Sequence, residues 1–304
     1  IEDNIKINLS LKQTLRYGEN PHQSAGFYLE QGTNLNWNQI QGKDLSYNNF
    51  ADMDSAIGII NEFENIACSI IKHSNPCGFG IGDSPLIAYK RAVSTDPVSY
   101  FGGIVSFNVM IDKVTAEELV KSFLECVIAP DFSIEALAIF KNKKNLRIIK
   151  TGTIKKNQNP LIRSMAGGYL IQDPDYLDES IDRSEIVTDS KPTKLEFKAL
   201  HLGWKIVKFV KSNAIVLADN KQLIGVGAGQ MSRIDSLKIA IRKAGEAELN
   251  LNGAILASDA FFPFPDNIIL AAKHGIKAII QPGGSIKDYL VIEKANELGI
   301  SMLF

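Results

Sequence analysis

The sequence predicts an α/β protein built from two lobes, and three observations lead to this fold class. The chain has 304 residues, 45% hydrophobic and 22% charged, which suffices for two compact lobes or one large α/β domain. Short apolar runs that are typical of strands alternate with segments of helical spacing. The order of these segments in the first half recurs in the second half.

The elements of the first half follow from apolar spacing and from capping residues. Ser84 is the expected N-cap of its helix, with Pro85 at the first helical position. Thr115 and Glu118 are expected to form the capping box of a later helix. The last helix carries lysines near its C-terminal end, where the helix dipole favours them. In order, the expected elements are a strand at 64–72, a helix at 84–93, a strand at 102–108, and helices at 115–127 and 134–145.

The second half repeats the alternation after polar, turn-rich segments at 153–160 and 173–194, which we expect to connect the lobes. A first lobe is therefore expected at 1–185 and a second at 186–304. The expected elements are a helix at 194–212, a strand hairpin at 213–230, a helix at 232–245, a strand at 253–262, a helix at 266–275, a strand at 276–284 and a final strand at 299–304.

The two halves also share sequence. "SPLIAYKRA" resembles "DSLKIAIRKA", and "FGGIVSFN" resembles "LNGAILASDAFF", with coincidence as the alternative explanation. Units of this βα kind build sheets whose functional loops stand at the C-terminal ends of the strands. We therefore expect the functional residues at those ends.

Charge and cysteine content narrow the setting. A net charge of −1 argues against a broad surface for nucleic acid but allows a local basic site for a phosphate. The sequence contains no run of 18 apolar residues and opens without the pattern of a signal peptide, so a membrane association is not expected. Three widely spaced cysteines without a C-x-x-C pair indicate a reducing, cytoplasmic setting.

The stretch "IIKHSNPCGFGIG" at 70–82 is the strongest candidate for chemistry. It places Lys72 beside His73 at the end of a predicted buried strand, so a cation and a titratable base stand together. Gly78, Gly80 and Gly82 follow, and we expect flexible backbone there, which would let the chain twist so that both side chains serve one site.

Two familiar sites are disfavoured. In "LIGVGAGQ" the glycines fall at 225, 227 and 229, so the third is one residue early for the dinucleotide fingerprint, and close packing is the alternative explanation. The four histidines include no pair at i, i+4, and the H-x-E and P-C-x-x-C motifs of zinc deaminases are absent from the sequence. A catalytic metal is therefore not expected.

Eight motifs, in order, resemble those of the AICAR transformylase family, the folate-dependent half of a bifunctional purine-biosynthesis enzyme. The resemblance covers roughly residues 15–304. The motifs are "LRYGENPHQSAGFY", "QGKDLSYNNFADMDSA", "IKHSNPCG", "STDPVSYFGGIVSFN", "VKSNAIV", "GVGAGQMSRIDS", "SDAFFPFPDN" and "IIQPGGSIKD".

Three departures from the family pattern accompany this resemblance. The sequence contains no IMP cyclohydrolase segment before the first motif and no basic tail after Phe304. It also has Pro265 where arginine is common in the family. On the resemblance, we expect such a tail to support mainly folate binding.

The resemblance implies a fold and a reaction. The fold is two tandem cytidine-deaminase-like lobes, with mixed sheets, flanking helices and no zinc, and with an N-terminal substrate-binding segment in the first lobe. The reaction moves a formyl group from the co-substrate 10-formyltetrahydrofolate to the 5-amino group of AICAR, giving FAICAR and tetrahydrofolate. A homodimer with sites between subunits is implied as well.

The resemblance also assigns roles, residue by residue. His73 is the expected general base, Lys72 stabilises developing negative charge, and Asn213 polarises the formyl group or the carboxamide. The residues expected to bind AICAR are Arg16, Tyr17, Gly102, Glu125 and Arg233. Those expected to line the folate pocket are Ile234, Phe261, Asp266, Ser285 and Ile286.

Two other functional classes stay open at this stage. A deaminase-type hydrolase would share the implied fold but lacks its zinc motifs, and metal analysis separates the two. A non-catalytic nucleotide-binding remnant would fit the missing tail, but the Lys72–His73 pair argues against it.

Overall fold

The computed structural model describes residues 4–35, 37–153, 159–175 and 181–304. The chain forms two compact units, residues 1–93 with 97–154, and residues 94–96 with 155–304. The expected boundary between residues 185 and 186 stays a prediction, because compactness does not show which segment folds alone. The two expected connecting segments lie partly outside the described residues, at 154–158 and 176–180.

The first unit is built on a six-stranded mixed sheet with the order β3-β8-β7-β6-β4-β5 and a separate β1-β2 hairpin. Strand β4 pairs antiparallel with both β5 and β6, whereas β6, β7 and β8 run parallel. The elements are β1 (Leu9–Leu15), β2 (Ala25–Glu30), β3 (Asn38–Gln41), α1 (Tyr47–Ile60), β4 (Ala67–Lys72), β5 (Asn75–Ile81), α2 (Pro85–Thr95), β6 (Ile104–Phe107), α3 (Lys113–Leu119), β7 (Cys126–Ala129), α4 (Ile134–Phe140) and β8 (Arg147–Lys150).

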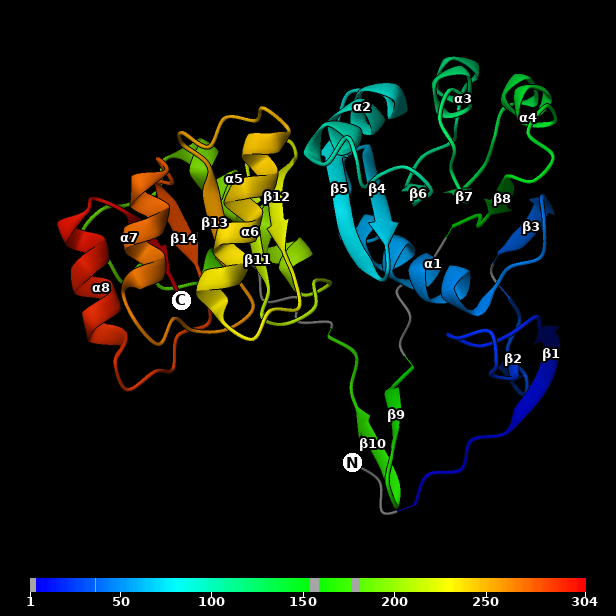
Figure 1. Cartoon of the computed structure of the whole chain (residues 1–304), viewed down its shortest axis with the longest axis horizontal. Coiled ribbons are helices and arrows are strands. Elements are labelled where there is room, and N and C mark those ends of the chain that lie inside the picture. Colours follow the sequence, from blue (N-terminus) through cyan, green and yellow to red (C-terminus); the bar gives the residue numbers. More distant parts are fainter. Residues whose placement is uncertain (1–3, 36, 154–158, 176–180) are drawn as a thin grey trace. The chain divides into compact units, whose positions relative to one another are not determined.

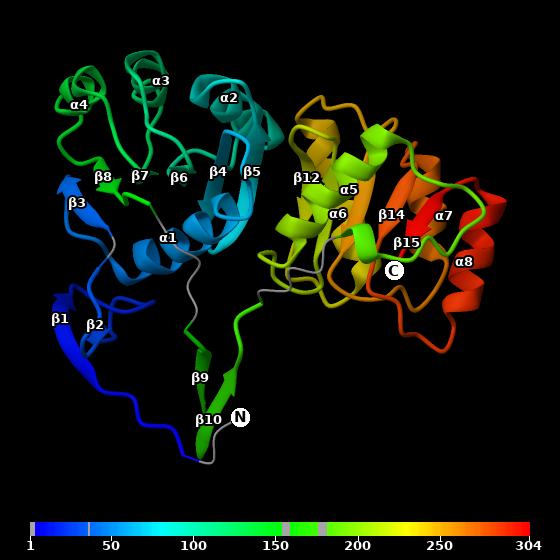
Figure 2. The same ribbon diagram turned by 180° about the vertical axis from the view of Figure 1, so that it is seen from behind.

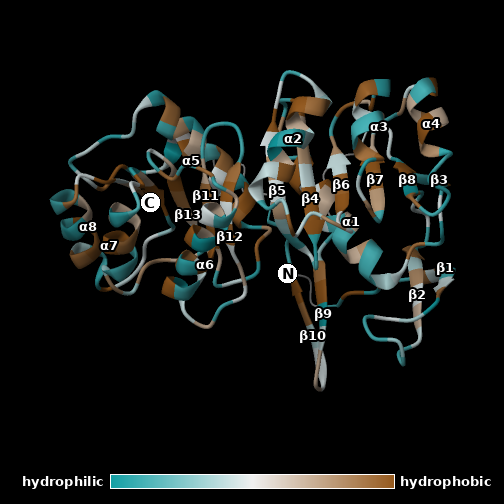
Figure 3. Ribbon diagram, turned by 45° about the horizontal axis from the view of Figure 1, so that its top comes forward, coloured by the Kyte–Doolittle hydropathy of each residue, from teal (hydrophilic) through white to brown (hydrophobic). Residues whose placement is uncertain are grey.

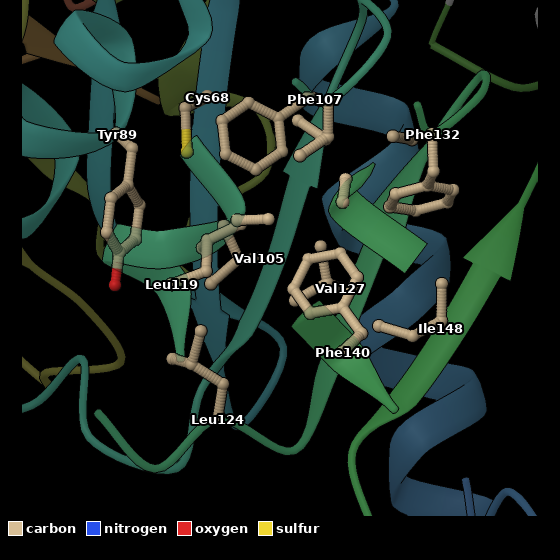
Figure 4. Close-up of a cluster of buried hydrophobic side chains, with 14 of the residues drawn as sticks. Cys68, Tyr89, Val105, Phe107, Leu119, Leu124, Val127, Phe132, Phe140 and Ile148 are labelled. Carbon is tan, nitrogen blue, oxygen red and sulfur yellow. The ribbon is translucent and has the colours of Figure 1, made fainter. Parts of the chain in front are cut away.

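Helices cover both faces of this sheet. Helix α1 lies on one face, and α2, α3 and α4 lie on the other (Figures 1 and 2). Side chains alternate between the faces, so Ile70 and Val105 point into the core beneath α2 and α3. Figure 4 shows this core, where Phe107 and Phe140 are fully buried.

The second unit has a five-stranded sheet with the order β12-β11-β13-β14-β15 and a separate β9-β10 hairpin. Hydrophobic residues concentrate along the central strand β13 (Figure 3), which is buried throughout. The elements are β9 (Leu161–Met165), β10 (Gly168–Gln172), the 3-10 helix η1 (Ile181–Arg183), α5 (Lys194–Val207), β11 (Ile215–Ala218), β12 (Leu223–Gly227), α6 (Arg233–Glu246), β13 (Ile255–Ser258), α7 (Asp266–Lys273), β14 (Ala278–Ile280), α8 (Asp288–Glu297) and β15 (Ser301–Leu303).

The topology confirms the internal repeat that the sequence suggested. Each unit contains the order α-β-β-α-β-α-β-α-β, from α1 to β8 in one and from α5 to β15 in the other. In the first sheet, β4 lies between its hairpin partner β5 and the three parallel strands β6, β7 and β8. In the second sheet, β11 lies in the same way between β12 and the parallel strands β13, β14 and β15. The chain is therefore a mixed α/β protein made of two units with one topology.

The glycines after His73 correct an expectation. Gly78, Gly80 and Gly82 lie on β5 or just after it, and they allow α2 to approach its backbone closely. A Cβ on Gly78 would lie 2.1 Å from the carbonyl oxygen of Ala92. Alternate residues of a strand point to one side of the sheet, so these glycines face α2 together. They therefore allow close packing of strand and helix and do not form a flexible loop.

The second unit uses glycine in the same way. A Cβ on Gly225 would lie 2.3 Å from the carbonyl oxygen of Ala240, and one on Gly227 would lie 1.9 Å from that of Ser236. Both contacts join β12 to α6. The "GVG" of this segment therefore allows β12 to pack closely against α6, which was the alternative explanation to a dinucleotide-binding loop.

Two expected helices are also corrected. The helix expected at 115–127 runs over Lys113–Leu119, with Asp112 as its N-cap, because the Asp112 carboxylate accepts from the Thr115 N–H at 2.8 Å. The second helix is Ile134–Phe140 and ends before the lysines that were expected to lie in its last turn. The first segment is shorter in part because Cys126 and Val127, which the expected helix included, belong to β7.

The described part of the chain contains neither a candidate membrane span nor a candidate metal-ligand cluster. None of its helices is long and apolar enough to span a bilayer. No three of its His, Cys, Asp or Glu side chains gather closely enough to hold a metal ion.

Candidate active site

The expected residues of the first unit gather at one edge of its sheet. Lys72 ends β4, Gly102 lies just before β6, and Glu125 lies just before β7. Since β4 is antiparallel to β6, and β6 is parallel to β7, these positions are neighbours across the sheet. This edge carries the amino ends of the parallel strands, so the residues assigned to the site in this unit do not stand at the carboxyl ends, where βα units usually carry functional loops.

The reversal follows from the hairpin that begins the unit. Strand β4 runs against the three parallel strands, so its carboxyl end meets their amino ends. The rule for βα units applies to parallel strands followed by helices, and β4 is instead followed by the turn to β5.

His73 occupies a tight turn with unusual backbone geometry. Lys72 pairs with Asn75, which leaves His73 and Ser74 as the two turn residues. Their φ angles are +52° and +58°. A two-residue hairpin turn of type I′ needs this left-handed geometry at both positions, and glycine or asparagine usually provides it. A left-handed residue other than glycine costs about 1–2 kcal/mol, so surrounding contacts must hold the turn.

Lys72 is fixed against the loop that precedes β6. Its Nζ atom donates to the carbonyl oxygen of Phe101 at 2.7 Å. Gly102 follows with φ +71°, and its N–H donates to the carbonyl of Phe123 at 2.8 Å. The ammonium of Lys72 therefore stands beside Gly102, which we expected to bind AICAR. His73 is exposed on the turn.

A pocket of about 960 Å³ opens farther along the same edge. Arg16, Tyr17 and Glu125, three of the residues expected to bind AICAR, line it. Its wall also includes Ser46, which caps the N-terminus of α1, and Lys43. Lys72, His73 and Gly102 are not among the lining residues and stand at the neighbouring strand ends. Arg16, Lys43 and the helix N-terminus suit an anionic group of a ligand, and the carboxylates of Asp44 and Glu125 supply hydrogen-bond acceptors in the same pocket.

Arg147 holds Glu125 at this pocket. One guanidinium nitrogen of Arg147 donates to Glu125 Oε2 at 2.6 Å, and its Nε donates to the Asp44 carbonyl at 3.0 Å. The Arg147 side chain is only 11% exposed, whereas Glu125 is 36% exposed. The carboxylate of Glu125 is thus fixed in position and still accessible from the pocket.

The expected residues of the second unit lie at the opposite edge of its equivalent sheet. Asn213 precedes β11, while Phe261 follows β13 and Ser285 follows β14. Strand β11 is antiparallel to β13, and β13 is parallel to β14. These residues therefore occupy the edge with the carboxyl ends of the parallel strands, where βα units usually carry functional loops.

Arg233 is buried in a polar cluster and oriented toward Asn213. Its guanidinium donates to Asn213 Oδ1 at 2.7 Å, to Ser258 Oγ at 3.0 Å and to Asp259 Oδ1. The Asn213 amide nitrogen donates in turn to the Gln230 carbonyl at 2.8 Å. Arg233 therefore positions Asn213, and its expected contact with the nucleotide stays a prediction.

Asp259 is the anion that balances Arg233. Burial opposes ionisation of this carboxyl, but hydrogen bonds from Ser212, the Ala214 N–H and Arg233 outweigh burial, so the pKa of Asp259 lies below its ordinary value. The carboxylate is thus charged at neutral pH and anchors both residues that flank Asn213.

The residues expected to line a folate pocket divide into a structural and an exposed set. Asp266 begins α7, and Ser285 lies in a turn whose N–H groups bind Asp288. Phe261 is 40% exposed and Ile286 is 97% exposed, so both offer apolar surface. Ile234 is half-buried at the start of α6.

Three residues with clear roles were missed by the sequence analysis: Asp52, Arg147 and Asp259. Each acts through a partner far along the chain, and spacing does not show this. A signal existed for Asp52 and Asp259, because they lie within the quoted motifs "QGKDLSYNNFADMDSA" and "SDAFFPFPDN".

Comparison with known proteins identifies the family. The family described as AICARFT/IMPCHase bienzyme matches residues 1–243. The bifunctional purine biosynthesis proteins PurH of Persephonella marina and Caldicellulosiruptor saccharolyticus are each 49% identical to the chain, over 96% and 99% of its length. PurH of Listeria monocytogenes is 50% identical over 99% of it.

The chain spans 58–60% of the length of these relatives. A solved structure titled "Acinetobacter baumannii RibD, form 2" has 18% identity over 33% of each chain, with a TM-score of 0.23, and carries no weight here. The match over residues 1–243 covers most of the chain. The chain therefore belongs to the AICARFT/IMPCHase bienzyme family.

Proposed function

We propose that this chain transfers the formyl group of 10-formyltetrahydrofolate to the 5-amino group of AICAR, giving FAICAR and tetrahydrofolate in purine biosynthesis. Family membership supports this class of reaction. The observation that carries the proposal is the Lys72–His73 pair at the end of β4, beside Gly102.

The chemistry explains why such a pair is needed. The amine of AICAR is a poor nucleophile, because its lone pair is delocalised into the imidazole and the carboxamide. As it attacks the formyl carbon, His73 removes its proton, and Lys72 stabilises the oxygen that gains charge. When the bond from the formyl carbon to N10 of the folate breaks, the imidazolium of His73 returns that proton to N10. The base is thus neutral again at the end of the cycle.

Substrate contacts are proposed for both units. In the first unit, Arg16, Tyr17 and Glu125 bind AICAR in the pocket that they line. In the second unit, Asn213 polarises the formyl group or carboxamide, and the exposed side chains of Phe261 and Ile286 contact the folate. The proposed folate set also contains Ile234, Asp266 and Ser285, and the proposed AICAR set contains Gly102 and Arg233.

Exchange of His73 tests this proposal most directly. We expect His73→Ala to abolish formyl transfer while AICAR affinity, measured by calorimetry, changes by less than about tenfold. His274→Ala, a change in the C-cap residue of α7, serves as the matched control and should keep wild-type turnover. If His73→Ala kept more than about a tenth of wild-type turnover, His73 would not be the base.

We also propose that both units have the cytidine-deaminase-like fold. Their shared strand order, an antiparallel hairpin followed by three parallel strands, supports this assignment. An experimental structure in which the two units fail to superpose would contradict it.

A homodimer is proposed as the functional form. Two-stranded hairpins are marginally stable alone, yet β9-β10 exposes 72% of Tyr169 and 56% of Leu170. Covering these side chains in a second copy would remove that surface from water. A fully active monomer in sedimentation velocity at micromolar concentration would argue against the dimer.

A further inference from the structure

The turn that carries His73 lacks the residues that usually form such a turn. Both His73 and Ser74 have positive φ angles, and neither is glycine or asparagine. Strained backbone of this kind persists only where neighbouring groups fix it, and it is concentrated at functional sites. The contacts that fix this turn therefore decide where the His73 side chain stands.

Asp52 supplies the principal contact. Its Oδ1 atom accepts a hydrogen bond from the Ser74 N–H at 2.6 Å, and the Ser74 hydroxyl lies 3.4 Å from the same oxygen. On the other side of the turn, the Asn75 amide donates to the His73 carbonyl at 3.0 Å. The bond from the Ser74 N–H is stronger than the bond to the His73 carbonyl, because its acceptor is a carboxylate oxygen.

The acceptor stands on a rigid element. Asp52 lies in α1, where its neighbour Met53 is buried and Ala56 is fully buried beneath the sheet. A capping box of Ser46 and Asn49 fixes the start of the same helix. The position of the carboxylate is thus set by the core, and through Ser74 it sets the position of the turn.

We infer that Asp52 is a positioning residue that holds His73 in its reactive place by fixing the Ser74 N–H. The inference rests on the proposed role of His73 as general base. Asp52 touches neither substrate in this scheme. Its removal should therefore slow the proton transfer and leave substrate binding almost unchanged.

Steady-state kinetics of Asp52→Ala separate this role from a general loss of structure. We expect kcat to fall by about 10- to 100-fold, the effect of losing one hydrogen bond to a charged acceptor, with KM for both substrates within about threefold. Asp83→Ala, an exposed aspartate of the same unit, is the control and should match wild type. Equal kcat for Asp52→Ala and Asp83→Ala would overturn the inference.

The variant Asp52→Asn keeps the shape of the side chain and serves if the alanine variant does not fold. It retains an oxygen acceptor without the charge, so kcat should fall by a smaller factor, about 3- to 10-fold. Wild-type kcat in this variant would also contradict the role of Asp52.

A second-site change tests the mechanism. Glycine adopts positive φ without strain, so Ser74→Gly added to Asp52→Ala should raise kcat at least about fivefold above that of Asp52→Ala alone. If Asp52 served only the stability of the whole fold, Asp52→Ala would lower the melting temperature, and adding Ser74→Gly would not restore kcat. Failure of Ser74→Gly to raise kcat would count against the inference.

Amide hydrogen exchange gives a readout that does not depend on activity. In Asp52→Ala, the Ser74 amide should exchange at least about tenfold faster than in wild type, while amides in the middle of β4 stay protected. Unchanged exchange at Ser74 would refute the holding role even if kcat fell. If wild type fails to transfer formyl groups yet exchange at Ser74 accelerates, the proposed function fails and the contact through Asp52 stands.

Discussion

Substitution of Gly78 by alanine tests whether the glycines of β5 serve packing. A Cβ at this position would lie 2.1 Å from the Ala92 carbonyl oxygen, whereas ordinary contacts begin at 3.4 Å, so strand and helix must separate by about 1.3 Å. Helix α2 cannot move freely, because Ala88 and Ala92 are fully buried in the core. Overpacking usually costs about 1–3 kcal/mol, and a backbone contact places Gly78→Ala near about 3 kcal/mol.

Thermal and urea unfolding measure this cost. A loss of about 3 kcal/mol lowers Tm by about 6–12 °C in a domain of this size. Gly245→Ala is the matched control, because a Cβ added to that exposed helical glycine would meet no atom within 4 Å, and it should stabilise by about 0.5–1 kcal/mol. Equal unfolding free energies for the two variants would refute the packing argument. A Gly78→Ala variant that loses activity but keeps its Tm would instead restore the flexible-loop interpretation.

Three further predictions follow from the ion pairs and caps. The lowered pKa of Asp259 means that its stabilisation is present above about pH 4 and is lost as the pH falls through the folded-state pKa. Asp259→Asn should therefore cost about 3 kcal/mol in urea unfolding at pH 7 and far less near pH 2, and a cost independent of pH would contradict this. Arg147→Met should raise KM for AICAR about tenfold with kcat nearly unchanged, since Glu125 loses the bond that fixes it; an unchanged KM argues against Glu125 as a ligand. Thr193→Ala removes the capping box of α5 and should lower the free energy of unfolding by about 1 kcal/mol, whereas no change would show that α5 does not depend on its cap.

Most of the fold could be predicted from the sequence because apolar periodicity reports local structure. The helix that Ser84 caps and the hairpin of β11 and β12 formed where expected. The hairpin strand β5 was missed because its glycines mimic a loop, and only the helix packed on them explains their spacing. The cap at Thr115 was wrong because Asp112, an equally good cap, lies three residues earlier.

The candidate site was predictable only in part, for a physical reason. Lys72 and His73 are adjacent in sequence, so their shared location needs no tertiary structure to be seen. The pairs Asp52 with Ser74 and Glu125 with Arg147 each join residues 22 positions apart, and their contacts depend on how helices and strands pack. The pattern of a single sequence cannot show contacts of this kind.

The proposed site residues lie at the amino ends of the parallel strands in the first unit and at the carboxyl ends in the second. This difference affects which substitutions the chain can accept during evolution. Two copies of one topology provide two amino-end edges and two carboxyl-end edges, and the proposed chemistry uses one of each kind. Residues at the other two edges contribute to the fold alone. Exposed loop positions there, such as Met110 in one copy and Lys277 in the other, should accept substitutions that the working edges reject. A saturation library of variants, scored by growth without purines, would test this. In the first unit, substitutions should be tolerated at the carboxyl ends of the parallel strands, and in the second unit at their amino ends.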